Sequence, residues 1–123
     1  MTMLLGIDHA TLLVRSLERS KEYYERIFGF TCWERRDSPG TLVLESEHVH
    51  FFLVEDADAP DEYLRKQHIS FQVENLDQAM ERLRRLGVTE YETGKVAFFQ
   101  NRNYAWCEWR DPDGIRLEFV QSQ

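Results

Sequence analysis

The 123 residues of this chain allow one domain of ordinary size, and a hydrophobic content of 42% favours a globular fold over disorder. The formal net charge of -7 argues against a nucleic-acid partner, because phosphates require a basic face. The sequence has no membrane-length apolar run, no leader pattern and only two cysteines, so we predict a cytoplasmic protein without a membrane partner or a disulfide framework.

The first half of the chain is predicted to hold a strand, a helix and three more strands, at 6–14, 17–28, 30–36, 41–45 and 48–54. Ser16 can cap the helix N-terminus, and Gly29 can adopt the left-handed conformation that ends a helix. Because short turns join the last three strands, we expect an antiparallel meander. The acidic stretch 56–62 contains a proline and is predicted to be a linker.

The second half repeats this order. Its predicted strands and helix lie at 68–73, 76–86, 88–91, 104–110 and 115–121, and residues 92–103 show no clear pattern. Asn75 is a candidate helix cap, and Asp111–Gly114 has the composition of a tight turn. We therefore predict a single domain over 1–123, made of one module at about 4–55 and another at about 63–123.

The two halves match residue by residue. A shift of 59 positions places His9 on His68 and Thr11 on Ser70. Residues two apart in a strand face the same way, so each strand presents a histidine and a hydroxyl on one side. Related units tend to associate about a pseudo-twofold axis, which would bring the two histidines together.

A carboxylate can complete a metal-ligand set with these two imidazoles. Glu118 lies between Leu117 and Phe119 in a strand that otherwise has a buried pattern, where an unpaired carboxylate is costly. Two imidazoles and one carboxylate suit a divalent metal that keeps open positions for a substrate. The alternative is that each histidine is an ordinary core residue with its hydrogen bonds satisfied.

Four segments resemble the vicinal oxygen chelate superfamily, which includes glyoxalase I, bleomycin- and fosfomycin-resistance proteins, epimerases and extradiol dioxygenases. They are Ile7–His9, Leu17–Phe30, His68–Phe71 and Asp111–Glu118. The resemblance implies an α+β fold in which two βαβββ modules form an eight-stranded, U-shaped mixed sheet around a shared cleft. It also implies a divalent metal (Zn, Ni, Mn or Fe) held by residues that match His9, His68 and Glu118.

The superfamily's fourth ligand position lies on the last strand of the first module. Glyoxalases and epimerases carry a carboxylate there, whereas this chain offers His50 or Phe52. With His50 the site gains a fourth ligand or a neutral base, and with Phe52 the metal has three protein ligands. The alternative for His50 is a polar position on an outer face.

The resemblance predicts a metal-dependent enzyme that acts on a small substrate chelated through adjacent oxygens, as a lyase, isomerase, thiol transferase or dioxygenase. His50 and Glu108 are the candidate catalytic residues, although Glu108 also fits an outer face. Thr11, Ser70, Tyr104 and Trp106 are candidate substrate-pocket residues.

The resemblance also includes two other activities. Fosfomycin resistance ranks lower because the chain lacks the basic C-terminal segment of those proteins. A metal-free, bleomycin-type module that sequesters a cationic aromatic ligand is the alternative function, supported by the acidic charge and three tryptophans.

The resemblance also implies a homodimer, with the site either within one chain or across two.

Overall fold

The computed structural model describes residues 3–99 and 102–123. The chain divides into two compact units, residues 1–60 and 61–123, which we call the first and second modules. None of the helices in the described part of the chain has the length and hydropathy needed to cross a membrane.

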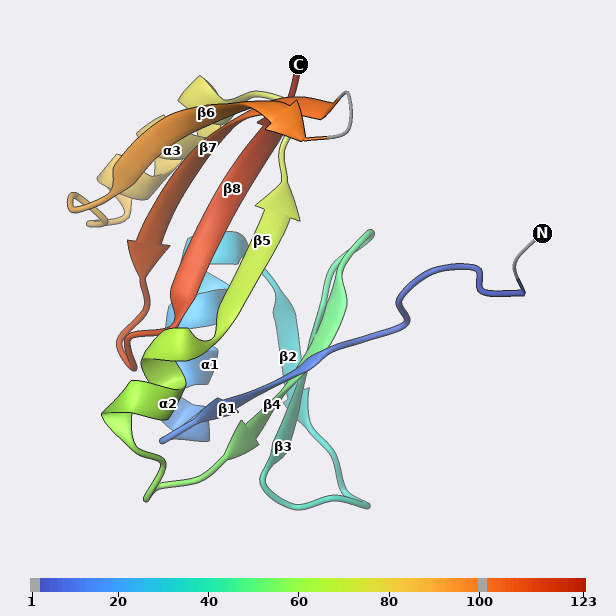
Figure 1. Cartoon of the computed structure of the whole chain (residues 1–123). Helices are drawn as coiled ribbons and strands as arrows, with labels where there is room; N and C mark the ends of the chain where they lie inside the picture. The colour runs from blue at the N-terminus through green and yellow to red at the C-terminus, as the bar shows by residue number, and fades with distance from the viewer. Residues whose placement is uncertain (1–2, 100–101) are drawn as a thin grey trace. The chain divides into compact units, whose positions relative to one another are not determined.

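The first module is one helix and one four-stranded sheet (Figure 1). Its elements are β1 (Thr11–Val14), α1 (Leu17–Phe28), β2 (Thr31–Glu34), β3 (Thr41–Glu45) and β4 (His50–Glu55). The strand order is β1-β4-β3-β2. Strand β1 runs parallel to β4, and the predicted meander of β2, β3 and β4 is antiparallel.

Helix α1 has the bounds that its sequence predicts. The Ser16 side chain accepts a hydrogen bond from the Arg19 backbone N–H, and Gly29 ends the helix with φ of 73°. The side chains of Tyr24 and Ile27 are buried, which places one face of the helix in the core of this module.

The second module repeats the plan after one added helix (Figure 1). Its elements are α2 (Asp61–Lys66), β5 (His68–Gln72), α3 (Leu76–Arg85), β6 (Glu92–Phe99), β7 (Arg102–Arg110) and β8 (Arg116–Ser122). The strand order is β5-β8-β7-β6, with β5 parallel to β8. The predicted α+β class with two βαβββ modules is thus confirmed, and the eight strands form two four-stranded sheets.

Three local predictions were wrong. The first strand begins at Thr11 rather than Gly6, because β1 pairs only with β4 and the residues before Ala10 lie beyond that pairing. Residues 88–91 form no strand, and the unassigned stretch after them forms β6 through its pairing with β7. The linker prediction missed α2, which begins at Asp61.

The turn between β7 and β8 is built as its composition predicts. The Asp111 carboxylate accepts hydrogen bonds from the backbone N–H groups of Asp113 and Ile115, at 2.8 and 3.0 Å. Gly114 has φ of 88°, which favours glycine. This turn fixes the register of β8, and therefore which residues of β8 face the same way as His68.

Candidate metal centre

One row of side chains crosses the sheet of the second module. Ser70 on β5 pairs in register with Glu118 on β8, which pairs with Glu108 on β7, which pairs with Glu92 on β6. Residues that pair in register lie on the same face of a sheet. Glu108 therefore shares a face with Glu118.

His68 and Glu118 meet on this face. The Nε2 atom of His68 lies 3.4 Å from the Oε1 atom of Glu118, and the Glu118 side chain is only 11% exposed. Within residues 3–99 and 102–123, this is the only ion pair of Glu118. A buried carboxylate beside one imidazole is a donor pair that suits a divalent cation, so the residues present fit the implied metal.

His9 lies in the first module, two residues before β1. Its ring stacks on Phe52, with ring centroids 4.2 Å apart, and its Nδ1 atom lies 2.7 Å from the Oδ2 atom of Asp8. The hydrogen bond with His9 lowers the pKa of the Asp8 carboxyl. When Nδ1 carries the proton and donates the hydrogen bond to this carboxylate, the Nε2 atom of His9 has the lone pair that a metal ligand requires.

The pairing register of β1 and β4 shows which residue of the first module is the counterpart of Glu118. Thr11 on β1 pairs with Phe52 on β4, as Ser70 on β5 pairs with Glu118 on β8. Phe52 is therefore the counterpart of Glu118, and a phenyl ring cannot bind a metal as a carboxylate does. His50 pairs with Glu45 and lies near His9, with ring centroids 5.8 Å apart.

The predicted ligands are divided between the modules: His9 lies in the first, and His68 and Glu118 lie in the second. Among the residues that the structure describes, no three potential metal-donor side chains gather in one group. Each module by itself brings together at most part of a ligand set.

The predicted pocket residues occupy different environments. Thr11 and Ser70 are exposed, and Tyr104 and Trp106 are half-buried on β7. Tyr104, Trp106 and Glu108 are spaced two residues apart along β7, so all three lie on the same face of the sheet. Glu108 itself is held by an ion pair with Arg116, whose Nε atom lies 2.9 Å from Glu108 Oε2.

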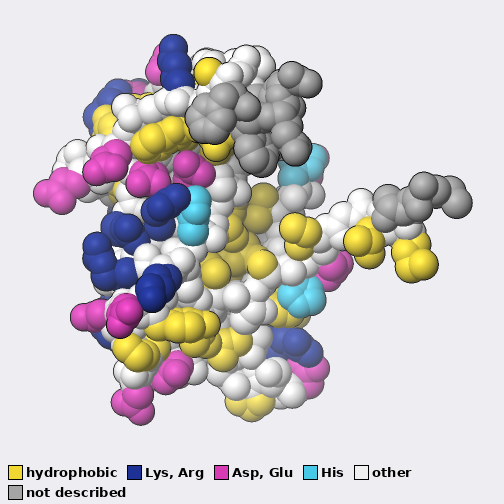
Figure 2. Space-filling view, viewed as in Figure 1, with side chains coloured by type: hydrophobic (Ala, Val, Ile, Leu, Met, Phe, Trp, Pro, Cys, Tyr) yellow, Lys and Arg dark blue, Asp and Glu magenta, His cyan; other side chains and the backbone are white. Residues whose placement is uncertain are grey.

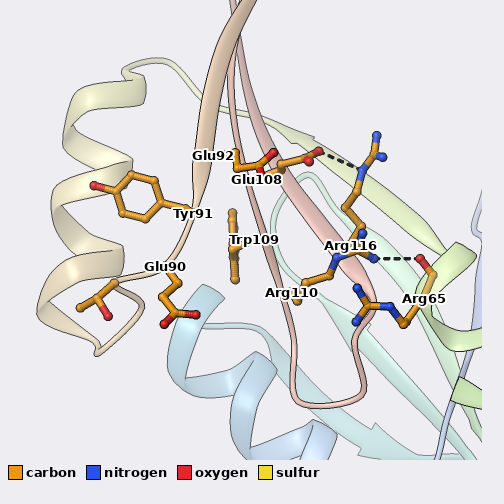
Figure 3. A pocket seen from close by; sticks show the side chains of 9 residues that line it. Arg65, Glu90, Tyr91, Glu92, Glu108, Trp109, Arg110 and Arg116 are labelled. Atoms are coloured by element: carbon orange, nitrogen blue, oxygen red, sulfur yellow. Dashed lines mark hydrogen bonds and ion pairs between the residues drawn. The ribbon is translucent and has the colours of Figure 1, made fainter.

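The second module also contains a cavity of about 610 Å³ that was not predicted from the sequence (Figure 3). Arg65, Arg110 and Arg116 contribute to its lining. A signal was present in the sequence, because Arg110 directly precedes the predicted turn and Arg116 follows it after Ile115, which places both arginines at the same end of the hairpin. They do pair in register.

Comparison with known proteins identifies the family. Residues 6–119 match the profile of the Glyoxalase/Bleomycin resistance protein/Dioxygenase superfamily. The chain belongs to this superfamily. The match spans both modules and confirms the resemblance on which the sequence analysis relied.

Relatives within the superfamily are distant. A lactoylglutathione lyase of Neisseria meningitidis is 27% identical over 128 residues, covering 94% of this chain and 89% of the relative. A probable trivalent organoarsenical cleaving enzyme of Bacillus subtilis is 27% identical over 121 residues, covering 94% and 79%. A solved protein from the mobile metagenome of V. pseudocholerae shares the fold, with a TM-score of 0.76, 21% identity, and coverage of 98% of this chain and 97% of that one.

Proposed function

We propose that this superfamily member is a divalent-metal-dependent enzyme whose ligands are His9, His68 and Glu118. The observation that carries the proposal is the buried Glu118 carboxylate beside the imidazole of His68. We include His9 in the set because the internal repeat makes it the counterpart of His68. The Asp8 hydrogen bond leaves its Nε2 atom suited to ligation.

Phe52 limits the proposed set to three protein ligands. Two histidines and one carboxylate leave coordination positions open, and this set is typical of non-haem iron(II) sites. Catalytic zinc sites use the same set, so the proposal covers Zn, Ni, Mn and Fe. A bound divalent ion would polarise two adjacent oxygens of a substrate as a Lewis acid.

The proposed catalytic groups flank the proposed ligands. His50 lies beside His9, is exposed, and as a neutral imidazole can accept a proton. Glu108 lies beside Glu118 in register, and Arg116 holds its carboxylate in place. Thr11, Ser70, Tyr104 and Trp106 are proposed to position the substrate through their hydroxyl groups and rings.

The names of the two distant relatives support an enzyme that cleaves a small molecule, since one is a lyase and the other a cleaving enzyme. The resemblance to glyoxalases and epimerases implies a carboxylate at this position, and this chain has the phenyl ring of Phe52 in its place. A proton shuttle that uses a metal-bound carboxylate of the first module is therefore not part of the proposal.

Metal analysis of purified protein tests the ligand set. We expect close to one divalent ion per chain in the wild type, and a large loss in His68→Ala and in His9→Ala. His48→Ala is the matched control, because its side chain is 84% exposed on the turn before β4 and forms no part of the proposed set. Wild-type metal content in the His68→Ala variant would contradict the proposal.

The second candidate function is a metal-free module that sequesters a cationic aromatic ligand. It is favoured by the face of the first sheet on which Trp33, Val43 and Phe52 pair in register, because rings on such a surface can stack on a flat cation. Trp33 is 48% exposed. Metal-free protein that binds an aromatic cation tightly, and loses that binding in Trp33→Ala, would support this function over the enzyme.

We also propose that the protein forms a homodimer through its N-terminal segment. The segment extends away from β1, and hydrophobic side chains line it (Figures 1 and 2). Leu5 and Ile7 are fully or almost fully exposed, at 104% and 89%. Large apolar side chains on an extended segment are costly in water and are typical of a segment that pairs with another chain.

The oligomeric state in solution tests this proposal. We expect light scattering to give twice the chain mass for the wild type, and a shift toward monomer for the double variant Leu5→Ser, Ile7→Ser. Tyr63→Ser is the matched control, because Tyr63 is 52% exposed at another place on the surface. A wild-type protein that is monomeric at high concentration would contradict the dimer.

A cytoplasmic location remains part of the proposal. Both cysteines, Cys32 and Cys107, are free thiols. Free thiols persist in a reducing compartment, which supports the cytoplasm.

A further inference from the structure

Charged side chains of both signs line the cavity of the second module. Three arginines, Arg65, Arg110 and Arg116, and three glutamates, Glu90, Glu92 and Glu108, contribute to it. The guanidinium groups lie on one side, which we call the arginine corner, and Glu90 and Tyr91 lie on the other side of Trp109 (Figure 3).

The arginine corner carries more positive charge than its carboxylate partners offset. Glu108 pairs with Arg116. In the described part of the chain, neither Arg65 nor Arg110 forms an ion pair with a carboxylate. Arg110 and Arg116 also pair directly in register, and like charges opposite one another in a sheet are destabilising.

Backbone contacts hold Arg110 in this unfavourable place. Its Nη1 atom donates to the carbonyl of Arg65 at 2.8 Å and to that of Gly114 at 3.0 Å. The first bond satisfies a carbonyl at the C-terminus of α2, and the second ties the guanidinium to the β7–β8 turn. Within residues 3–99 and 102–123, the other N–H donors of Arg110 form no hydrogen bond, so they can bind a ligand.

Arg65 is held beside it by a close approach to the same turn. A Cβ atom added at Gly114 would lie 3.1 Å from the Cγ atom of Arg65 and 3.6 Å from Nη1. The Arg65 side chain therefore packs over Gly114, whose carbonyl binds Arg110. Two guanidinium groups that form no ion pair with a carboxylate of the described residues thus lie at one end of the cavity.

We propose that the arginine corner binds an oxyanion, a carboxylate or a phosphate group, through Arg65 and Arg110. Planar guanidinium groups bind these oxyanions with paired, charge-assisted hydrogen bonds. An oxyanion there offsets the repulsion between Arg110 and Arg116. Because Glu90 lies on the other side of Trp109 and repels an anion there, the ligand places its anionic group at the arginine corner (Figure 3).

The site lies next to the proposed metal ligands within the same module. Arg116 pairs in register with His68, and Glu118 is two residues further along β8 on the same face. A substrate with an anionic group and two adjacent oxygens can therefore reach both places at once. That the oxyanion belongs to the substrate rests on the proposed function, whereas the binding of an anion does not.

Calorimetric titration of metal-free protein with inorganic phosphate and, separately, with acetate tests the site at fixed ionic strength. We expect saturable binding of at least one anion, and the tighter of the two identifies the group. Arg65→Gln should raise its dissociation constant at least about tenfold. The Arg65 guanidinium donates no hydrogen bond within the described residues, and its carbonyl remains available to Arg110, so this variant should fold as the wild type does.

Arg82→Gln is the matched control, because it removes the same charge from an exposed position on α3 of the same module. It should change the dissociation constant less than about twofold, since a distant exposed charge is screened. Equal weakening in Arg65→Gln and Arg82→Gln, or no saturable binding of either anion, would overturn the oxyanion site. Arg65→Gln should also retain the metal content of the wild type, so loss of the anion site is distinguishable from failure of the proposed function.

Discussion

His68 Nε2 lies 3.4 Å from Glu118 Oε1 across the parallel pair of β5 and β8. The contact joins the residue that opens one strand to a buried residue of another, and it leaves the carboxylate with an imidazole as its partner. This relationship makes Glu118 the first residue to test.

Glu118→Gln should lower the affinity for divalent metal at least about tenfold, because an amide replaces a charged ligand. The rise in the melting temperature on adding metal should shrink in the same variant. Glu47→Gln, at a side chain that is 87% exposed, should behave as the wild type does. Thermal unfolding with and without metal measures both effects, and an unchanged metal response in Glu118→Gln would remove Glu118 from the ligand set.

Phe52→Glu should tighten metal binding by about tenfold, since it places a carboxylate at the counterpart of Glu118. Phe52→Gln is the control, because it has nearly the same size and no charge. Metal competition with a chromogenic chelator measures the difference between the two variants. Equal affinities in both would show that this position does not reach the metal.

Gly94→Ala should lower the free energy of unfolding by about 1–3 kcal/mol, as overpacking substitutions do. A Cβ atom at Gly94 would lie 2.5 Å from Cζ2 of Trp106, because the indole of Trp106 lies against β6. The same substitution in a Trp106→Ala background should cost much less. Denaturant unfolding of the four proteins gives the coupling, and additive effects would contradict the close approach of glycine and indole.

Stability should decrease at alkaline pH in part through Cys107. Burial raises the pKa of this thiol from 9.0 to about 11, and the carboxylates of Glu108 and Glu118 act in the same direction. The unfolded thiol loses its proton first, so the stabilisation is present below about pH 9 and is lost as the pH rises toward about 11. Cys107→Ala should show a smaller decline over this range than the wild type, measured by denaturant unfolding; equal declines would contradict the assignment.

Local residues were sufficient to predict the parts of the structure that depend on neighbours in the chain. The bounds of α1 follow from Ser16, its apolar stripe and Gly29, and the β7–β8 turn follows from Asp111–Gly114. The repeat of His9 in His68 was also visible in the sequence, as was the superfamily resemblance that the family profile confirms. Whether 1–123 is a single domain, and whether the three ligands share one metal, stay predictions.

Tertiary structure decided everything that depends on which strands pair and in which register. Pairing with β7 made β6 from a stretch without a local pattern, and the limited pairing of β1 with β4 left Leu5 and Ile7 exposed. Register assigned Phe52, and not His50, as the counterpart of Glu118, and it set Arg110 opposite Arg116. The physical reason is that a strand's partner lies far away in sequence, so no local pattern contains the information.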